Sequence, residues 1–158
     1  MQLTFNNGNN ISPTVLENGN IIFCSDFQGG RPQLYQLDRQ NDSLRCLSEN
    51  SDVCFSPAYC PINKKVVYTK MVDGCGQLFL YNTKTGVHKQ ITFDDGHKQE
   101  ASWSPCGNYL AFGFSNDKVK RIAIQNVYTG KRIFVTSEHS VCTYPSWSMN
   151  FTVIPVIK

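Results

Sequence analysis

The fold of this chain is decided by the stretch ASWSPCGNYLAF, residues 101–112. It begins as a short strand that ends at Trp103, and an apolar strand, Tyr109–Phe112, follows it. Between them Pro105-Cys106-Gly107 supplies turn residues, of which Gly adopts the positive φ that a tight hairpin needs. The stretch therefore predicts two antiparallel strands joined by a short turn.

The same pattern recurs every 44 residues along the chain. The position of Trp103 is occupied by Val15, Tyr59 and Trp147 in the other copies. Further landmarks keep this interval without insertions: Pro13, Pro57, Ala101 and Pro145; Leu34, Leu78 and Ile122; Leu3-Thr4, Leu47-Ser48, Ile91-Thr92 and Val135-Thr136; Gly86 and Gly130, with Asp42 in the first copy. Several landmarks in one register indicate an internal structural repeat.

Each copy is expected to form four strands. A short first strand precedes an apolar second strand and an apolar third strand, and a more polar last strand ends in Leu-Ser, Ile-Thr or Val-Thr. Four strands in about 40–50 residues are typical of a propeller blade. We therefore predict an all-β fold, a β-propeller segment with three full four-stranded blades at residues 13–48, 57–92 and 101–136, and partial blades at both ends, the remnants 1–5 and 145–158.

The two ends of the chain break the repeat. Residues 2–5 match a last strand without the rest of its blade, and the fourth copy opens normally at 144–148 but then places Pro155 inside its second strand. Proline cannot donate to a central ladder. We expect an open apolar face at each end blade, and therefore self-association through the open blade ends.

Composition narrows the classes of partner. The net charge is +3 and the basic residues are scattered, so no nucleic-acid partner is expected. No apolar run approaches the ~20 residues of a membrane span, and the first residues lack the pattern of a signal peptide, so no direct membrane insertion is expected. Seven Cys without zinc spacing predict mostly free thiols.

No catalytic or cofactor motif stands out. A Gly-x-Ser-x-Gly elbow and a glycine-rich phosphate loop are both missing from the sequence. His88 is expected in solvent on an outer strand, and His97 and His139 in loops. Asp94-Asp95-Gly96 has too few oxygen ligands for a Ca²⁺ loop and is interpreted as a turn. We predict no enzyme activity, no cofactor and no metal.

Two stretches resemble the TolB family. Residues 23–35 resemble its repeated Ser-Asp-x-x-Gly-x-Pro-Gln-(hydrophobic)-Tyr pattern, and residues 101–112 its Trp-Ser-Pro-Asp-Gly hallmark, with Cys106 in place of Asp. Gln2-Leu3-Thr4 and Gln90-Ile91-Thr92 are similar to its closing Leu-Thr. The resemblance implies a periplasmic, non-catalytic propeller of the Tol–Pal envelope system, which maintains the outer membrane and its constriction during division. Its implied partner is the lipoprotein Pal.

This resemblance covers nearly all of residues 2–148 but leaves out parts of the family. The signal peptide and the N-terminal α/β domain are missing, so the sequence is similar to an internal piece of such a protein. Related blades occur in prolyl-oligopeptidase-type serine peptidases. The alternative is therefore a regulatory propeller that gates substrate.

The candidate partner-binding residues lie where one copy passes to the next. These connections, residues 6–12, 49–56, 93–100 and 137–144, are expected to be loops on one face of the propeller, and loops on a rigid scaffold often carry binding residues. The resemblance implies that this face docks Pal. The candidates are Asn10, Ile11, Ser12, Cys54, Phe55, Ser56, Lys98, Gln99, Glu100, Cys142, Thr143 and Tyr144. Trp103 and Trp147 are expected to pack between blades instead.

Overall fold

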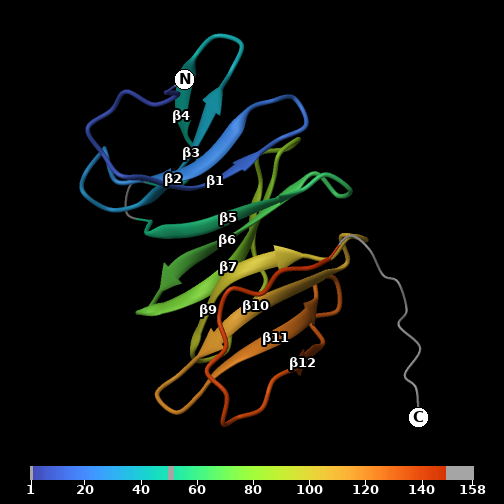
Figure 1. Ribbon diagram of the computed structural model, residues 1–158. Coiled ribbons are helices and arrows are strands. Elements are labelled where there is room, and N and C mark those ends of the chain that lie inside the picture. The colour runs from blue at the N-terminus through green and yellow to red at the C-terminus, as the bar shows by residue number, and fades with distance from the viewer. Residues whose placement is uncertain (1, 50–51, 149–158) are drawn as a thin grey trace.

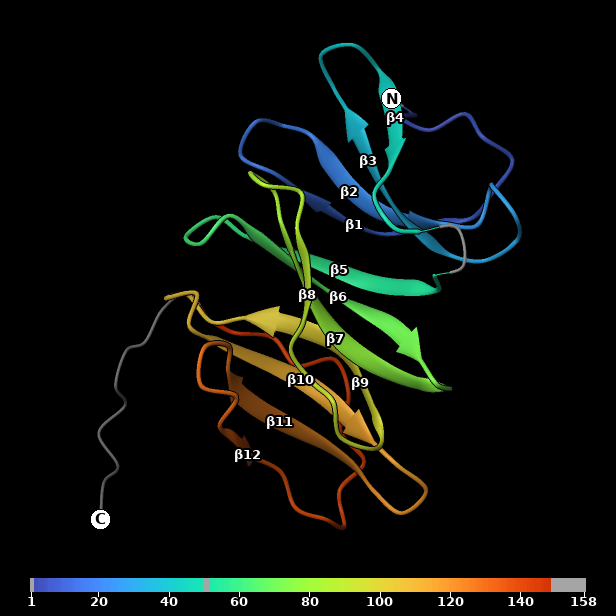
Figure 2. The same cartoon turned by 180° about the vertical axis from the view of Figure 1, so that it is seen from behind.

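A computed structural model describes residues 2–49 and 52–148. These residues form three four-stranded antiparallel sheets, which follow one another in chain order in Figures 1 and 2. The first sheet contains β1 (Asn10–Val15), β2 (Ile21–Ser25), β3 (Gln33–Asp38) and β4 (Ser43–Cys46); the second β5 (Cys54–Cys60), β6 (Lys65–Val72), β7 (Cys75–Asn82) and β8 (His88–Gln90); the third β9 (His97–Trp103), β10 (Tyr109–Ser115), β11 (Lys120–Asn126) and β12 (Arg132–Phe134). The predicted all-β fold with three four-stranded blades is confirmed.

The strand order within each sheet places the first strand on the inside. Neighbouring strands in the chain are neighbours in the sheet, and the first strands β1, β5 and β9 contact one another from blade to blade. The last strands, β4, β8 and β12, form the outer edges and are only three or four residues long. Short outer strands with polar residues limit edge-to-edge pairing with other chains.

The inner strands are longer than the sequence predicted. β1, β5 and β9 begin at residues 10, 54 and 97, inside the segments that were expected to be loops, so that expectation is wrong. Each strand continues through a β-bulge, which shifts its register against the second strand between Ile11 and Thr14, between Phe55 and Ala58, and between Ala111 and Gly113 on the partner strand. Pairing resumes beyond each bulge, so the strand continues although the bulge bends it.

The second strand of blade 1 is displaced by one residue relative to the 44-residue interval, so the interval is not kept at every position of the repeat. Ile21 pairs with Val15, whereas Val66 pairs with Tyr59 and Leu110 with Trp103, which makes Ile21 and not Ile22 the equivalent of Val66. The first hairpin of blade 1 is one residue shorter, because its turn is closed from residue 16 to residue 20, against 104 to 109 in blade 3. A one-residue slip moves every side chain to the other face.

The Ser or Thr of each closing Leu-Ser, Ile-Thr or Val-Thr pair forms a hydrogen bond within its own blade. After each outer strand ends, the Ser or Thr hydroxyl accepts a hydrogen bond from a backbone N–H of the third strand. The donor and acceptor pairs are Leu34 N to Ser48 Oγ (3.0 Å), Leu78 N to Thr92 Oγ1 (2.8 Å) and Ile122 N to Thr136 Oγ1 (2.9 Å). The hydroxyl thus continues the ladder beyond the last strand and explains why this landmark recurs.

Apolar side chains fill the space between blades. Leu16, Cys24 and Leu34 of blade 1 meet Val66 and Tyr68 of blade 2 in one buried cluster. A second cluster joins blades 2 and 3, and Trp103 packs against it while its Nε1 donates to the carbonyl of Ala58 (2.9 Å). Trp147 repeats this bond to Ser102 (3.0 Å). The expected interblade position is confirmed for Trp103, whereas Trp147 is described only by its contact with blade 3.

We expected an open apolar face at each end blade, but segments of the chain itself lie against both faces. Residues 2–5 form no strand but lie over blade 1, where Leu3 packs against Phe23, Tyr35 and Leu37, each no more than 5% exposed. At the other end, the N–H of Cys142 donates to Lys120 of blade 3 (3.2 Å). Of the C-terminal remnant, residues 149–158 lie outside the described residues. Each end face is therefore partly covered by the chain itself.

Candidate functional site

Four backbone positions, three of them on the inner strands, share an uncommon conformation. Ser12, Ser56, Glu100 and Tyr144 have φ of 53°, 50°, 58° and 53°. A residue with a side chain in this left-handed region costs roughly 1–2 kcal/mol, because its Cβ approaches the following carbonyl. The first three occupy the bulges of β1, β5 and β9, and the fourth follows at the same interval. Strained backbone that is kept in every repeat is typical of functional sites.

These four residues come together in one groove. The inner groove, as we call it, has a volume of about 300 Å³ and runs across the bulges of successive blades. Its lining residues are Ser12, Pro13, Ser56, Pro57, Ala58, Glu100, Ala101, Tyr144 and Pro145. Four of the twelve predicted candidates therefore line a common cavity, although Ser12, Ser56 and Glu100 lie on strands and not in loops as predicted. The wall residues Pro13, Pro57, Ala101 and Pro145 were predicted as repeat landmarks but not as site residues.

The groove combines hydrogen-bond acceptors with apolar walls. The carboxylate of Glu100, which is half-buried, accepts a hydrogen bond from the N–H of Tyr144 through Oε2 (3.0 Å). The hydrogen bond and charge of Glu100 raise the pKa of the Tyr144 phenol. Hydroxyls of Ser12 and Ser56 lie along the same row, between proline and alanine side chains. Such a surface suits an extended protein segment that carries hydrogen-bond donors.

The other eight candidates do not line the inner groove. Cys54 is fully buried in the cluster between blades 1 and 2, where burial first and the charge of Asp52 second raise the pKa of its thiol to about 12. A thiol in this state is unreactive and cannot touch a partner. Those that remain outside the groove are Asn10, Ile11, Phe55, Lys98, Gln99, Cys142 and Thr143.

Lys98 was expected to contact a partner, and its burial excludes that. Its side chain is completely buried, and its ammonium donates to the carbonyl oxygens of Asp94, Asp95 (2.8 Å) and Gly96 (3.0 Å). We call this arrangement the carbonyl cage. Burial lowers the pKa of the Lys98 ammonium, although the neighbouring Asp94 carboxylate opposes the shift. The segment interpreted as a turn, residues 94–96, is thus folded around an internal cation.

Asp94 joins the carbonyl cage to the edge of blade 3. Its two carboxylate oxygens accept bidentate hydrogen bonds from Arg132 of β12 (2.6 and 2.9 Å). Burial alone would raise the pKa of this carboxyl, but the hydrogen bonds and charge of Arg132, with the charge of Lys98, lower it to about 2. Bidentate guanidinium–carboxylate pairs fix geometry well. The interblade loop is therefore held from both sides.

Two histidine expectations are wrong. His88 is half-buried on β8, where its Nδ1 is hydrogen-bonded to the Tyr68 hydroxyl (2.8 Å) and its ring lies 4.7 Å from that of Tyr81. The outer strand is polar only in part, because its alternate side chains pack on blade 2. His97 lies in β9 and accepts a hydrogen bond from the N–H of Gly76 (3.1 Å). Both rings are held by the scaffold.

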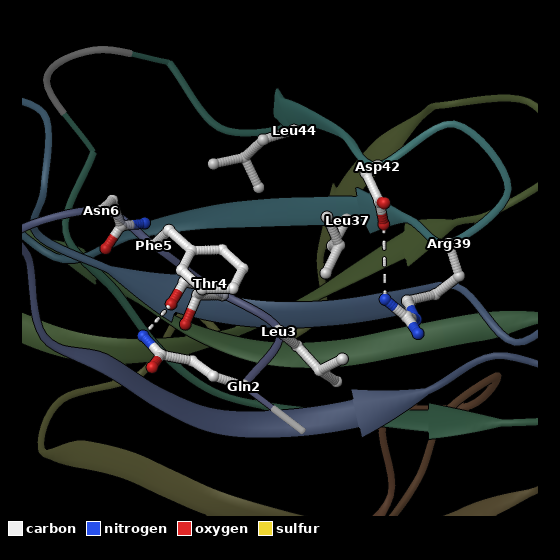
Figure 3. Close-up of a pocket in the computed structure, with 9 residues that line it drawn as sticks. All are labelled: Gln2, Leu3, Thr4, Phe5, Asn6, Leu37, Arg39, Asp42 and Leu44. Carbon is white, nitrogen blue, oxygen red and sulfur yellow. Dashed lines mark hydrogen bonds and ion pairs between the residues drawn. The ribbon is translucent and has the colours of Figure 1, made fainter.

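Two other cavities lie over blade 1, and of the candidate residues Asn10 lines the smaller one. One of about 490 Å³ separates residues 2–6 from blade 1, and Figure 3 shows Leu3, Phe5, Leu37 and Leu44 around it. Within the described ranges 2–49 and 52–148, no group of three His, Cys, Asp or Glu side chains is placed to hold a metal ion. The same residues contain no helix long and apolar enough to cross a membrane.

Both a curated relative and a solved structure that are similar to this chain are TolB proteins. The TolB homolog of Chlorobaculum tepidum is 28% identical over 96 residues, which are 61% of this chain and 22% of that protein. The crystal structure of TolB from Acinetobacter baumannii matches 85% of this chain and 34% of its own, with a TM-score of 0.73 and 23% identity. The chain is a TolB-like β-propeller segment. It spans about a fifth of the curated relative's length and a third of the solved chain's.

The same fold occurs in proteins with other activities. The structure of a putative TolB from Agrobacterium tumefaciens matches 85% of the TolB-like segment and 51% of its own chain, with a TM-score of 0.75 and 15% identity. A puromycin-hydrolyzing peptidase of Mycobacterium tuberculosis matches 87% of the segment and 22% of its own chain, with a TM-score of 0.69 and 13% identity. No protein-family model matches the sequence. At these identities the likeness is one of fold.

Proposed function

We propose that this TolB-like segment is a non-catalytic protein-binding module that docks the soluble domain of a Pal-like lipoprotein of the cell envelope on its inner groove. One observation carries the proposal: four strained positions of the repeat, at residues 12, 56, 100 and 144, meet in one groove. A scaffold that maintains the same strain in each blade presents a rigid and periodic surface. A periplasmic location follows from the same proposal.

The groove's chemistry supports a protein partner more than a small substrate. Its volume of about 300 Å³ is at the low end for a ligand pocket, and it extends across three blades as a row of bulges. Rows of this kind fit an extended segment or a helix edge of another protein. The likeness to peptidase propellers concerns the fold and gives no reason to prefer a substrate gate.

A calorimetric titration tests the proposal. The probe is the purified soluble domain of the Pal lipoprotein from the organism that encodes this chain, titrated into the 158-residue protein. Ser56→Trp should fill the middle of the inner groove and weaken binding by more than tenfold. Lys89→Glu, on the exposed outer strand β8, is the matched control and should bind like the wild type.

Two outcomes contradict this assignment. If Ser56→Trp and Lys89→Glu reduce the affinity equally, the partner does not occupy the inner groove. If the wild-type protein shows no binding at millimolar concentration while its β-sheet circular dichroism signal is intact, a Pal-like partner is wrong.

A further inference from the structure

We propose that the inner groove recognises a lysine side chain of its partner, whose ammonium is held by the carboxylate of Glu100 beside the ring of Tyr144. This inference rests on the proposed function, because it names the chemical group that the groove accepts. Its basis is the charge of the groove: Glu100 is the one ionisable carboxylate among the groove's nine lining residues.

The charge of Glu100 is not neutralised within the chain. Among the described residues, no Lys, Arg or His forms an ion pair with it. Two other acidic residues of the segments between blades are neutralised within the chain, since Asp52 is paired with Lys70 (2.6 Å) and Asp94 with Arg132. A half-buried carboxylate without a cation costs desolvation energy, which a cationic group from a partner would recover.

The surroundings of Glu100 orient its carboxylate toward the groove. One oxygen, Oε2, accepts the N–H of Tyr144, which fixes the side chain against the next position of the repeat. Glu100 itself is held at φ 58° in the bulge of β9, so its side chain leaves the strand from a rigid backbone position. The charge is therefore positioned before a partner arrives, which reduces the entropy lost on binding.

The groove's other residues match a lysine better than a bare cation. Pro57, Ala58 and Ala101 provide apolar walls along which a butyl stem can lie while the charged head reaches Glu100. Tyr144 lines the same groove and is 76% exposed, so its ring is accessible for a cation–π contact. The Ser12 and Ser56 hydroxyls offer acceptors to the backbone N–H groups of the same segment.

The test uses a lysine side-chain mimic, so it does not depend on a partner's identity. n-Butylammonium chloride is titrated into the ¹⁵N-labelled protein at constant ionic strength, with n-butanol as the uncharged control. The amide signals of Glu100 and Tyr144 should shift and saturate with the ammonium and not with the alcohol. The Glu100→Gln variant keeps an acceptor for the Tyr144 N–H and removes the charge. It should bind the ammonium about tenfold more weakly, as expected for one charge-assisted hydrogen bond.

The results separate this inference from the proposed function. Equal shifts with ammonium and alcohol, or an unchanged affinity in Glu100→Gln, would overturn lysine recognition even if the lipoprotein domain still binds the groove. For the protein partner, each of its exposed lysines is changed to methionine in turn. Lysine recognition predicts one variant whose loss of affinity disappears in the Glu100→Gln background. Additive losses for every lysine would refute it.

Discussion

Cys54 and Lys98 occupy the same position of the repeat in consecutive blades, yet one is a thiol and the other an ammonium. Each is paired with the second strand in the same register, Cys54 with Lys70 and Lys98 with Phe114, and each side chain is fully buried. The first packs in an apolar cluster, and the second lies in the carbonyl cage. Both side chains are buried at this position, and the residues of the preceding loop determine whether their surroundings are apolar or rich in carbonyl oxygens.

The two preceding loops explain this difference. In the first, the buried Asp52 carboxylate accepts the N–H of Glu49 (3.2 Å) and binds the ammonium of Lys70. In the second, the carbonyls of residues 94–96 turn inward, where only a buried donor can satisfy them. The same fold thus tolerates a charge in its interior where the backbone solvates it.

The largest effect is expected from Lys98→Met. The substitution retains an apolar stem but leaves the inward carbonyls of Asp95 and Gly96 without their donor, whereas that of Asp94 keeps the Gln77 Nε2 (2.9 Å), so the free energy of unfolding should fall by roughly 3 kcal/mol. Urea denaturation followed by tryptophan fluorescence measures it. A loss below about 1 kcal/mol would mean that water replaces the ammonium and that the cage is not essential.

Cys54→Ala should cost less, because it only removes a sulfur atom from an apolar cluster. We expect a loss of about 1 kcal/mol in the same urea experiment, from a small cavity beside Leu34 and Tyr68. If Cys54→Ala destabilises as much as Lys98→Met, the contrast between the apolar and the caged position is wrong.

The smallest effect concerns Asp94 and appears only in acid. Its folded-state pKa of about 2 lies below the ordinary 3.8, so the stability it contributes is present above pH 3.8 and is lost as pH falls toward 2. Because the side chain is half-exposed, the contribution should stay below about 1 kcal/mol. Asp94→Asn should flatten the fall in stability across this window, measured by thermal unfolding.

Asp117→Asn is the control for this acid experiment, since that residue is exposed in the hairpin between β10 and β11 and forms no ion pair among the described residues. Its unfolding curve should follow that of the wild type. An equal flattening in both variants would assign the acid sensitivity to net charge and not to the Asp94–Arg132 pair.

Much of the fold was predictable because the repeat is periodic. The Trp103 landmark located the inner strand, and the closing Thr92 proved to satisfy a backbone donor of the third strand. Two features of the fold could not be predicted from the sequence pattern. The bulges extend the inner strands into expected loops, and a shorter turn at Leu16–Asn20 shifts the second strand of blade 1 by one residue. Both depend on hydrogen-bond geometry.

The candidate site was predicted in part for the same reason. Periodicity identified Ser12, Ser56, Glu100 and Tyr144, because residues at one phase of a repeat occupy one row in the fold. It could not separate them from Cys54 and Lys98, which share the same segments but point into the interior. A bulge reverses the alternation of side chains, and its position is not visible in composition.

The central claim is that the inner groove is the binding surface, and NMR chemical-shift mapping tests it most directly. The unlabelled soluble Pal-domain is added to the ¹⁵N-labelled chain, and shifts are compared between the bulges of β1, β5 and β9 and the outer strands β4, β8 and β12. The account predicts that the largest shifts cluster at Ser12, Ser56, Glu100 and Tyr144. Shifts concentrated on the outer strands, or on residues 2–6 over blade 1, would contradict it.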